Sequence, residues 1–208
     1  SGKDKTAAEQ GLNDSIPQAT TEKLTENKLK AYELGDKEHE EEQSREEMGK
    51  LFDLEASGYF YTRLQNPTND TVAAKICALE GGSAAMLLSS GQAANFYAIF
   101  NIAGCGDHII SSTSIYGGTF NLFSVTMKRM GVEFTFVDPE CSEEELNAAF
   151  RPNTKAVFGE TIANPALTVL DIEKFAKAAH AHGVPLIMDN TFATPVNCRP
   201  FEWGCDIV

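Results

Sequence analysis

Basic residues are scarce in this sequence of 208 residues, and its cysteines show no paired spacing. Seventeen lysines and arginines stand against thirty aspartates and glutamates, which gives a net charge of −13. That charge would repel nucleic-acid phosphates and anionic lipid, so we expect neither nucleic acid nor a membrane as a partner. The five cysteines never occur as C-x-x-C. We therefore expect no disulfide framework, no zinc ribbon and no metal site.

Long apolar runs are missing as well. No stretch approaches the length of a bilayer span, and the start of the chain, SGKDKTAAEQ, has no signal-peptide core. We therefore expect a cytoplasmic protein with reduced thiols. The length suits one large domain, or a domain with an appendage.

The first 50 residues differ from the remainder of the chain. They are highly charged and offer few apolar anchors, which predicts a charged, largely helical arm or a partly disordered segment over residues 1–50. From residue 51 to 208 helix-like and strand-like stretches alternate. The helix-like stretches are residues 70–80, 92–103, 118–130, 143–150 and 171–182, and the strand-like ones are 84–89, 108–112, 132–137, 155–160 and 184–189. This order predicts an α/β fold with a mostly parallel sheet flanked by helices.

Polar residues stand at the ends of the predicted strands, where ligands bind in such sheets. They are Ser89, Ser90, Gly91, Ser111, Ser112, Asp138, Glu160 and Asp189. Asp189 ends the apolar run VPLIMDN, so we expect its carboxylate in a buried site with a cationic partner. An equally good interpretation is that Asp189 caps a turn with Asn190. Glu160 is similarly open.

The stretch AAMLLSSGQAANFYAIF, residues 84–100, predicts a buried strand, a polar turn and a helix. Such a turn directs free N–H groups and the positive end of the helix dipole at a ligand, so Ser90, Gly91 and Gln92 could hold an anion. The alternative is an ordinary loop with a serine cap. The motifs G-x-G-x-x-G, G-x-x-x-x-G-K-[ST] and G-x-S-x-G are all missing, which disfavours dinucleotide, ATP and serine-hydrolase chemistry.

Six segments appear together in a recognisable order: YTRLQNPTND, ALEGG, LSSGQAA, SIYGGTFNLF, ETIANPALTVLDI and IMDNTFATP. From about residue 48 to 208 the chain resembles the pyridoxal-phosphate enzymes of cysteine and methionine metabolism. The resemblance implies a transferase fold of type I. It also implies that residues 51–208 are its cofactor-binding large domain, incomplete at the C-terminal end.

The resemblance implies a phosphate site held by Ser90, Gly91 and Gln92. It further implies that Tyr61 and Arg63 reach the phosphate of a neighbouring subunit, with Tyr61 also catalytic. The protein would then be a homo-oligomer, a dimer and in our expectation a tetramer, with shared sites.

The resemblance also assigns residues to the cofactor ring. Tyr116 would stack on the pyridine and take part in catalysis, and Asn164 would hydrogen-bond the phenolic oxygen. Asp189, the central catalytic residue, would keep the pyridine nitrogen protonated, and Thr191 would lie against the opposite face.

Within the family, YGGTFNLF and ETIANP resemble O-acetylhomoserine sulfhydrylases most. This similarity implies replacement of the acetoxy group of O-acetyl-L-homoserine by sulfide, giving L-homocysteine and acetate. Methionine γ-lyases usually carry a cysteine where Gly118 stands. Methionine γ-lyase and cystathionine γ-synthase or γ-lyase remain alternatives.

A lysine that forms the Schiff base follows a strand like CDIV in this family. Lys155, Lys174 and Lys177 stand elsewhere in the pattern, so we expect the sequence to end before that lysine. The alternative outside enzymology is an inactive fragment or an assembly piece.

Overall fold

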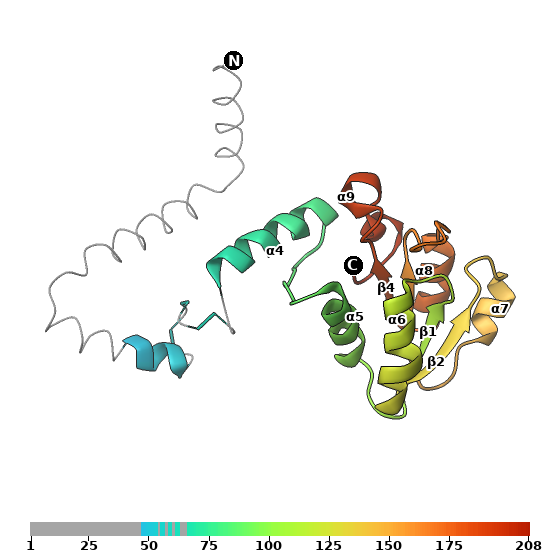
Figure 1. Cartoon of the computed structure of the whole chain (residues 1–208), viewed down its shortest axis with the longest axis horizontal. Helices are drawn as coiled ribbons and strands as arrows, with labels where there is room; N and C mark the ends of the chain where they lie inside the picture. Colours follow the sequence, from blue (N-terminus) through green and yellow to red (C-terminus); the bar gives the residue numbers. More distant parts are fainter. Residues whose placement is uncertain (1–46, 54, 57, 60, 63–65) are drawn as a thin grey trace, which may run out of the picture. The chain divides into compact units, whose positions relative to one another are not determined.

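The computed structural model describes residues 47–53, 55–56, 58–59, 61–62 and 66–208 (Figure 1). The chain divides into two units, Ser1–Gln65 and Asn66–Val208. The described part of the first unit contains a short helix at residues 47–52. The predicted arm lies outside the described residues except for its last four, so the arm and its boundary at residue 50 stay predictions.

The second unit is built on four parallel strands: β1 (His108–Ser112), β2 (Glu133–Val137), β3 (Thr154–Glu160) and β4 (Leu186–Asp189). Their spatial order is β2-β1-β3-β4, and every neighbouring pair is parallel. The predicted α/β fold with a parallel sheet is therefore confirmed, and all carboxyl ends of the strands lie at one edge.

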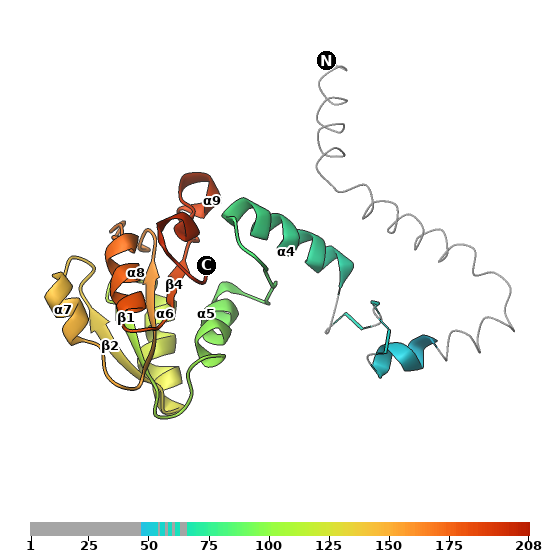
Figure 2. The ribbon, with the colours of Figure 1, turned by 180° about the vertical axis from the view of Figure 1, so that it is seen from behind.

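Two apolar clusters sandwich the sheet because successive strand side chains point to opposite faces. On β1, Ile109 belongs to the cluster with helix α5 (Gly91–Phe100) and the π-helix η1 (Leu122–Met127). Its neighbour Ile110 belongs to the cluster with α7 (Glu143–Ala148) and α8 (Ile172–Ala181). Figures 1 and 2 show these helices on the two faces of the sheet. The second unit thus has three layers.

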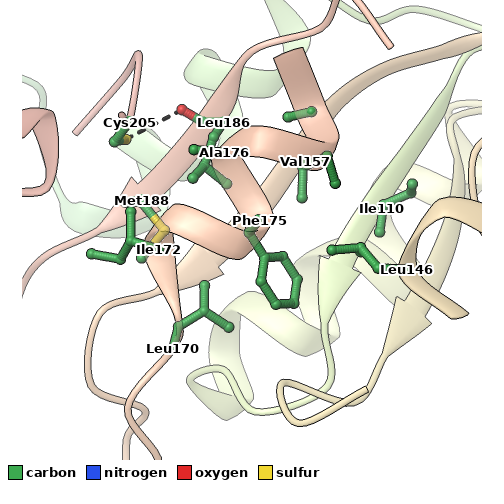
Figure 3. Packing of buried hydrophobic residues seen from close by; sticks show 12 residues of the cluster. Ile110, Leu146, Val157, Leu170, Ile172, Phe175, Ala176, Leu186, Met188 and Cys205 are labelled. Carbon is green, nitrogen blue, oxygen red and sulfur yellow. Dashed lines mark hydrogen bonds between the residues drawn. The ribbon is translucent and has the colours of Figure 1, made fainter. Parts of the chain in front are cut away.

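The α8 face of the sheet shows how this core is filled. Phe175 on α8 is fully buried and points toward Leu146 of α7 and Ile110 of β1 (Figure 3). Leu186 of β4 lies in the same cluster, and its carbonyl accepts a hydrogen bond from the Cys205 thiol at 3.2 Å. Burial raises the pKa of that thiol to about 12, so Cys205 behaves as a core residue.

The other helices have clear local causes. In α4 (Pro67–Glu80) the Asn66 side chain accepts hydrogen bonds from the N–H groups of Thr68 and Asn69, and proline occupies the first helical position. The expected helix at 118–130 divides into α6 (Gly117–Asn121) and η1. The short helices α9 (Thr194–Asn197) and η2 (Pro200–Trp203) follow β4. No helix in the described parts of the chain has both the length and the apolar character needed to cross a bilayer.

The predicted buried strand at residues 84–89 is wrong. This segment forms no strand in the described structure, and its residues are exposed, Met86 to 81%. A run of apolar residues satisfies the pattern of a buried strand, but a strand requires a partner for its backbone groups. None of the described strands lies beside this segment.

Candidate active site at the carboxyl edge of the sheet

A pocket of about 380 Å³ lies at the carboxyl edge of the sheet. Seven of the site residues predicted from the sequence line it: Ser90, Gly91, Gln92, Tyr116, Asn164, Asp189 and Thr191. Glu160, a strand-end candidate left open in the sequence, also lines the pocket, together with three residues that were not predicted: Asn95, Ile162 and Phe192. The structure thus brings these groups together, while their individual roles stay predictions.

The N-terminus of α5 opens into this pocket. Ser90 precedes the helix, and its hydroxyl accepts a hydrogen bond from the Ala93 N–H at 3.1 Å. The serine cap considered from the sequence is therefore present. A side chain added at Gly91 would meet no atom within 4 Å, so this glycine leaves space beside the first N–H groups of the helix. The capped turn can accordingly serve as an anion site as well.

The Asp189 carboxylate is held by neutral donors. Its Oδ1 accepts hydrogen bonds from the Thr191 hydroxyl at 2.5 Å and the Thr191 N–H at 3.0 Å, and its Oδ2 accepts one from Asn95 Nδ2 at 3.3 Å. Within Asn66–Val208 no lysine or arginine forms an ion pair with Asp189, so the cationic partner expected from the sequence is not among these residues.

Asp189 does cap the turn after β4, as one of the two interpretations of the sequence proposed, but with a different partner. The partner of Asp189 in this turn is Thr191, while the Asn190 side chain points elsewhere and donates to Glu80 Oε1 at 3.0 Å and to the Cys198 carbonyl at 2.9 Å. Asp189 therefore keeps acceptor capacity for a donor in the pocket.

Asn95 and Thr119 connect the two sides of the pocket and were missed from the sequence. The Thr119 hydroxyl accepts hydrogen bonds from Asn95 Nδ2 and Gln92 Nε2, both at 3.1 Å. Both residues are buried. The available signal was a polar residue inside the apolar stretch AANFYAIF, because a buried amide requires partners. This network joins the helix N-terminus to Asp189.

The Tyr116 ring depends on the glycine two residues later. A Cβ added at Gly118 would lie 2.5 Å from Tyr116 Cε1 and 3.3 Å from Gln92 Nε2, well inside contact distance. Tyr116 as a whole is 47% exposed and forms part of the pocket wall. The glycine therefore permits this position of the ring.

Glu160, left open in the sequence, is a buried member of the pocket wall. Its oxygens accept hydrogen bonds from the N–H groups of Tyr116 at 2.6 Å and Asn164 at 3.1 Å. Burial raises the pKa of the Glu160 carboxyl, the two N–H groups oppose this effect, and the nearby Asp189 charge adds to it.

Two of the predicted site residues, Tyr61 and Arg63, precede the unit that contains this pocket. Tyr61 belongs to the first unit and is 44% exposed, and Arg63 lies outside the described residues, so their approach to a pocket stays a prediction. No lysine is among the described residues in the pocket wall: Lys174 Nζ donates to the carbonyls of Pro139 and Cys141. The described residues also include no cluster of three or more His, Cys, Asp or Glu suited to a metal.

The model of one protein family, Cys/Met metabolism PLP-dependent enzymes, matches residues 38–208. The chain belongs to this family. O-acetyl-L-homoserine sulfhydrylase of Corynebacterium glutamicum is 50% identical over 165 residues, which cover 79% of this chain and 38% of that protein. Homocysteine/cysteine synthase of Saccharomyces cerevisiae is 48% identical over 159 residues, covering 76% of this chain and 36% of that protein.

A solved structure of this family has the same fold. It is a crystal structure of an O-acetylhomoserine (thiol)-lyase from Campylobacter jejuni that contains N'-pyridoxyl-lysine-5'-monophosphate. The match has a TM-score of 0.72 and 40% identity, and covers 76% of this chain and 39% of that one. The resemblance and the type I fold inferred from the sequence are therefore confirmed. The chain spans less than two fifths of the length of the curated relatives named above.

The pocket of this pyridoxal-phosphate family member has the features that such a cofactor requires. The open side of Gly91 offers space at a helix N-terminus for a phosphate, and Tyr116 supplies a flat aromatic surface. Asp189 supplies a fixed negative charge for a protonated ring nitrogen. The residues present therefore fit the cofactor.

Proposed function

We propose that this pocket binds pyridoxal 5'-phosphate and that the protein replaces the acetoxy group of O-acetyl-L-homoserine by sulfide, forming L-homocysteine and acetate. The observation that carries the proposal is the pairing, in one pocket, of an open helix N-terminus at Gly91 with the fixed carboxylate of Asp189. The two features match the two charged ends of the cofactor. The relatives' names then favour this reaction within the family.

Each pocket residue has a distinct task under this proposal. The N–H groups at Gly91 and Gln92, with Ser90 beside them, hold the phosphate. Asp189 holds the proton on the ring nitrogen, and Asn95 and Thr191 keep its carboxylate in place. When bound, the cofactor supplies an electron sink for bond breaking at the substrate's α-carbon.

Tyr116 and Asn164 orient the ring. Tyr116 would offer its aromatic face to the ring, Asn164 would donate to the phenolic oxygen, and Thr191 would lie against the other face. The Thr191 hydroxyl also supports Asp189. Fixing the ring in this way selects which substrate bond lies where the electron sink can act.

We further propose a homo-oligomer, at least a dimer, in which Tyr61 and Arg63 of one subunit contact the phosphate held by Ser90, Gly91 and Gln92 of the next. The described second unit exposes a row of apolar residues on α4, Val72, Ile76 and Leu79, spaced along one helical face. Such a row supports burial against another protein surface. The five free cysteines support a reducing, cytoplasmic location.

The test is a product assay on the full-length protein purified from its natural source. With O-acetyl-L-homoserine plus sulfide we expect L-homocysteine and acetate in equal amounts, and with L-methionine alone we expect little methanethiol. Rapid methanethiol release without homocysteine formation would favour the γ-lyase alternative. Absence of every activity, with no pyridoxal phosphate bound, would favour the non-enzyme alternative.

A further inference from the structure

Glu160, the last residue of β3, connects two loops of the pocket. One loop follows β1 and carries Tyr116, and the other follows β3 and carries Asn164. Glu160 Oε1 accepts the Tyr116 N–H at 2.6 Å, and Oε2 accepts the Asn164 N–H at 3.1 Å. The side chain is buried, with 5% of the residue exposed. One carboxylate therefore ties together two loops that come from neighbouring strands.

A glutamate at position 160 is well suited to accept two hydrogen bonds, but its buried charge lowers the stability of the fold. A carboxylate accepts through both oxygens, whereas a glutamine side chain accepts through one and donates through its amide nitrogen. Burying the charge nevertheless costs free energy, and this cost raises the pKa of Glu160. The two N–H groups oppose the rise, and the neighbouring Asp189 charge adds to it. A neutral residue would avoid this cost but would leave one of the two N–H groups without an acceptor.

Both bridged residues are among those assigned to the cofactor ring. Each donates a hydrogen bond from its backbone N–H to Glu160. A movement of either backbone segment would therefore move the attached side chain as well. Tyr116 is exposed over 47% of its surface, which leaves its backbone hydrogen bond to Glu160 as an important restraint on its position. The bridge thus sets the separation of Tyr116 and Asn164.

We propose that Glu160 is a positioning residue, whose carboxylate holds Tyr116 and Asn164 at the spacing needed to grip pyridoxal phosphate. The proposal rests on the function proposed above, and it assigns to Glu160 a task that acts through its two neighbours. Glu160 itself needs no contact with the cofactor.

The test compares Glu160→Gln and Glu160→Asp with the control Glu133→Gln in the full chain. Glu133 begins β2 and is paired with Arg151 away from this pocket. Hydrogen exchange at Tyr116 and Asn164, pyridoxal phosphate titration and thermal unfolding are measured on each variant. These readouts separate loosening of the loops from loss of the fold.

For Glu160→Gln we expect exchange at one of the two amides to accelerate roughly 10-fold, and cofactor affinity to weaken roughly 5- to 20-fold, with little change in the melting temperature. Glu160→Asp keeps both acceptor oxygens, so its affinity should lie between those of Glu160→Gln and the wild type. Glu133→Gln should match the wild type in exchange at both amides and in affinity.

Wild-type exchange at both amides together with wild-type affinity in Glu160→Gln would overturn the positioning role alone. If that variant fails to fold, Glu160→Asp decides: loss of protection at both amides with unchanged affinity would overturn the proposal. A wild-type protein that binds no pyridoxal phosphate would overturn the proposed function and this proposal with it.

Discussion

At the residue scale, the pocket depends on small and polar side chains that leave space or fill it with hydrogen bonds. Gly91 leaves room at the helix N-terminus, and Gly118 leaves room for the Tyr116 ring. Asn95, on helix α5, donates a hydrogen bond to the carboxylate of Asp189. Each contributes through its position relative to a neighbour, because none carries a charge of its own.

Replacing Gly118 by alanine should displace the Tyr116 ring, because the new Cβ would lie 2.5 Å from Tyr116 Cε1. We expect pyridoxal phosphate affinity to fall about 3- to 10-fold, the effect of losing one aromatic contact. Fluorescence titration measures it. The matched control is Gly117→Ala, whose added Cβ would meet nothing within 4 Å. Equal affinities in the two variants would contradict this role of Gly118.

Strand ends and family motifs predict the site residues where the backbone itself forms the site. Ser90, Gly91, Gln92 and Asp189 lie at the ends of elements, and all four are in the pocket wall. Asn95 and Thr119 were missed because their partners are distant in sequence: Asn95 and Asp189 are 94 residues apart. Such pairs arise from the sheet order, which periodicity does not specify.

At the scale of elements, all four strands were predicted, and β4, with the sequence LIMD, is the nearly continuous apolar run expected of a buried parallel strand. The same rule failed at residues 84–89, which are apolar and exposed. The helix expected at 118–130 was found, but its π-helical middle was not anticipated. The apolar content of a segment predicts how readily it can be buried. Whether the segment forms a strand depends also on a neighbouring strand that can pair with its backbone.

The buried side chain of His108, the first residue of β1, ties this strand to its two neighbours, β2 and β3. Its ring nitrogens lie 2.8 Å from the hydroxyls of Thr154 on β3 and Thr135 on β2. Burial lowers the pKa of His108 from its ordinary value of 6.5, and Arg151 lowers it further, against the opposing effect of Glu133. The folded protein therefore holds this imidazole neutral.

Acid should weaken the sheet through His108. The unfolded chain takes up a proton near pH 6.5, while the folded chain takes it up only at lower pH, so the stability gained above pH 6.5 is lost as the pH falls through the folded pKa. Urea unfolding from pH 7 downward should show a loss of at most about 1.4 kcal/mol per pH unit from this group. His108→Gln should lack this component, and the control His180→Gln, at the surface pair with Asp206, should retain it. An unchanged slope in His108→Gln would contradict the assignment.

At the scale of the whole molecule, the shared-site proposal predicts complementation between inactive variants. Arg63→Ala should weaken cofactor binding about 10- to 100-fold through loss of a charge-assisted bond to phosphate. Mixing it with Asp189→Asn should restore part of the activity, since a hybrid dimer contains one site with both residues intact. Activity is measured after subunit exchange has been verified. No recovery would show that both residues serve the same subunit's site, or that Arg63 does not contact the phosphate.

The central claim is that the pocket at the carboxyl edge of the sheet binds pyridoxal phosphate through Asp189. The most direct measurement is a titration of pyridoxal phosphate into wild-type protein, Asp189→Asn and the control Asp138→Asn. Asp138 follows β2, where its carboxylate accepts the Glu140 N–H at 2.8 Å outside the pocket. We predict that Asp189→Asn binds about 10- to 100-fold more weakly, with Asp138→Asn like the wild type. Equal binding by all three proteins, or no binding by any, would contradict the claim.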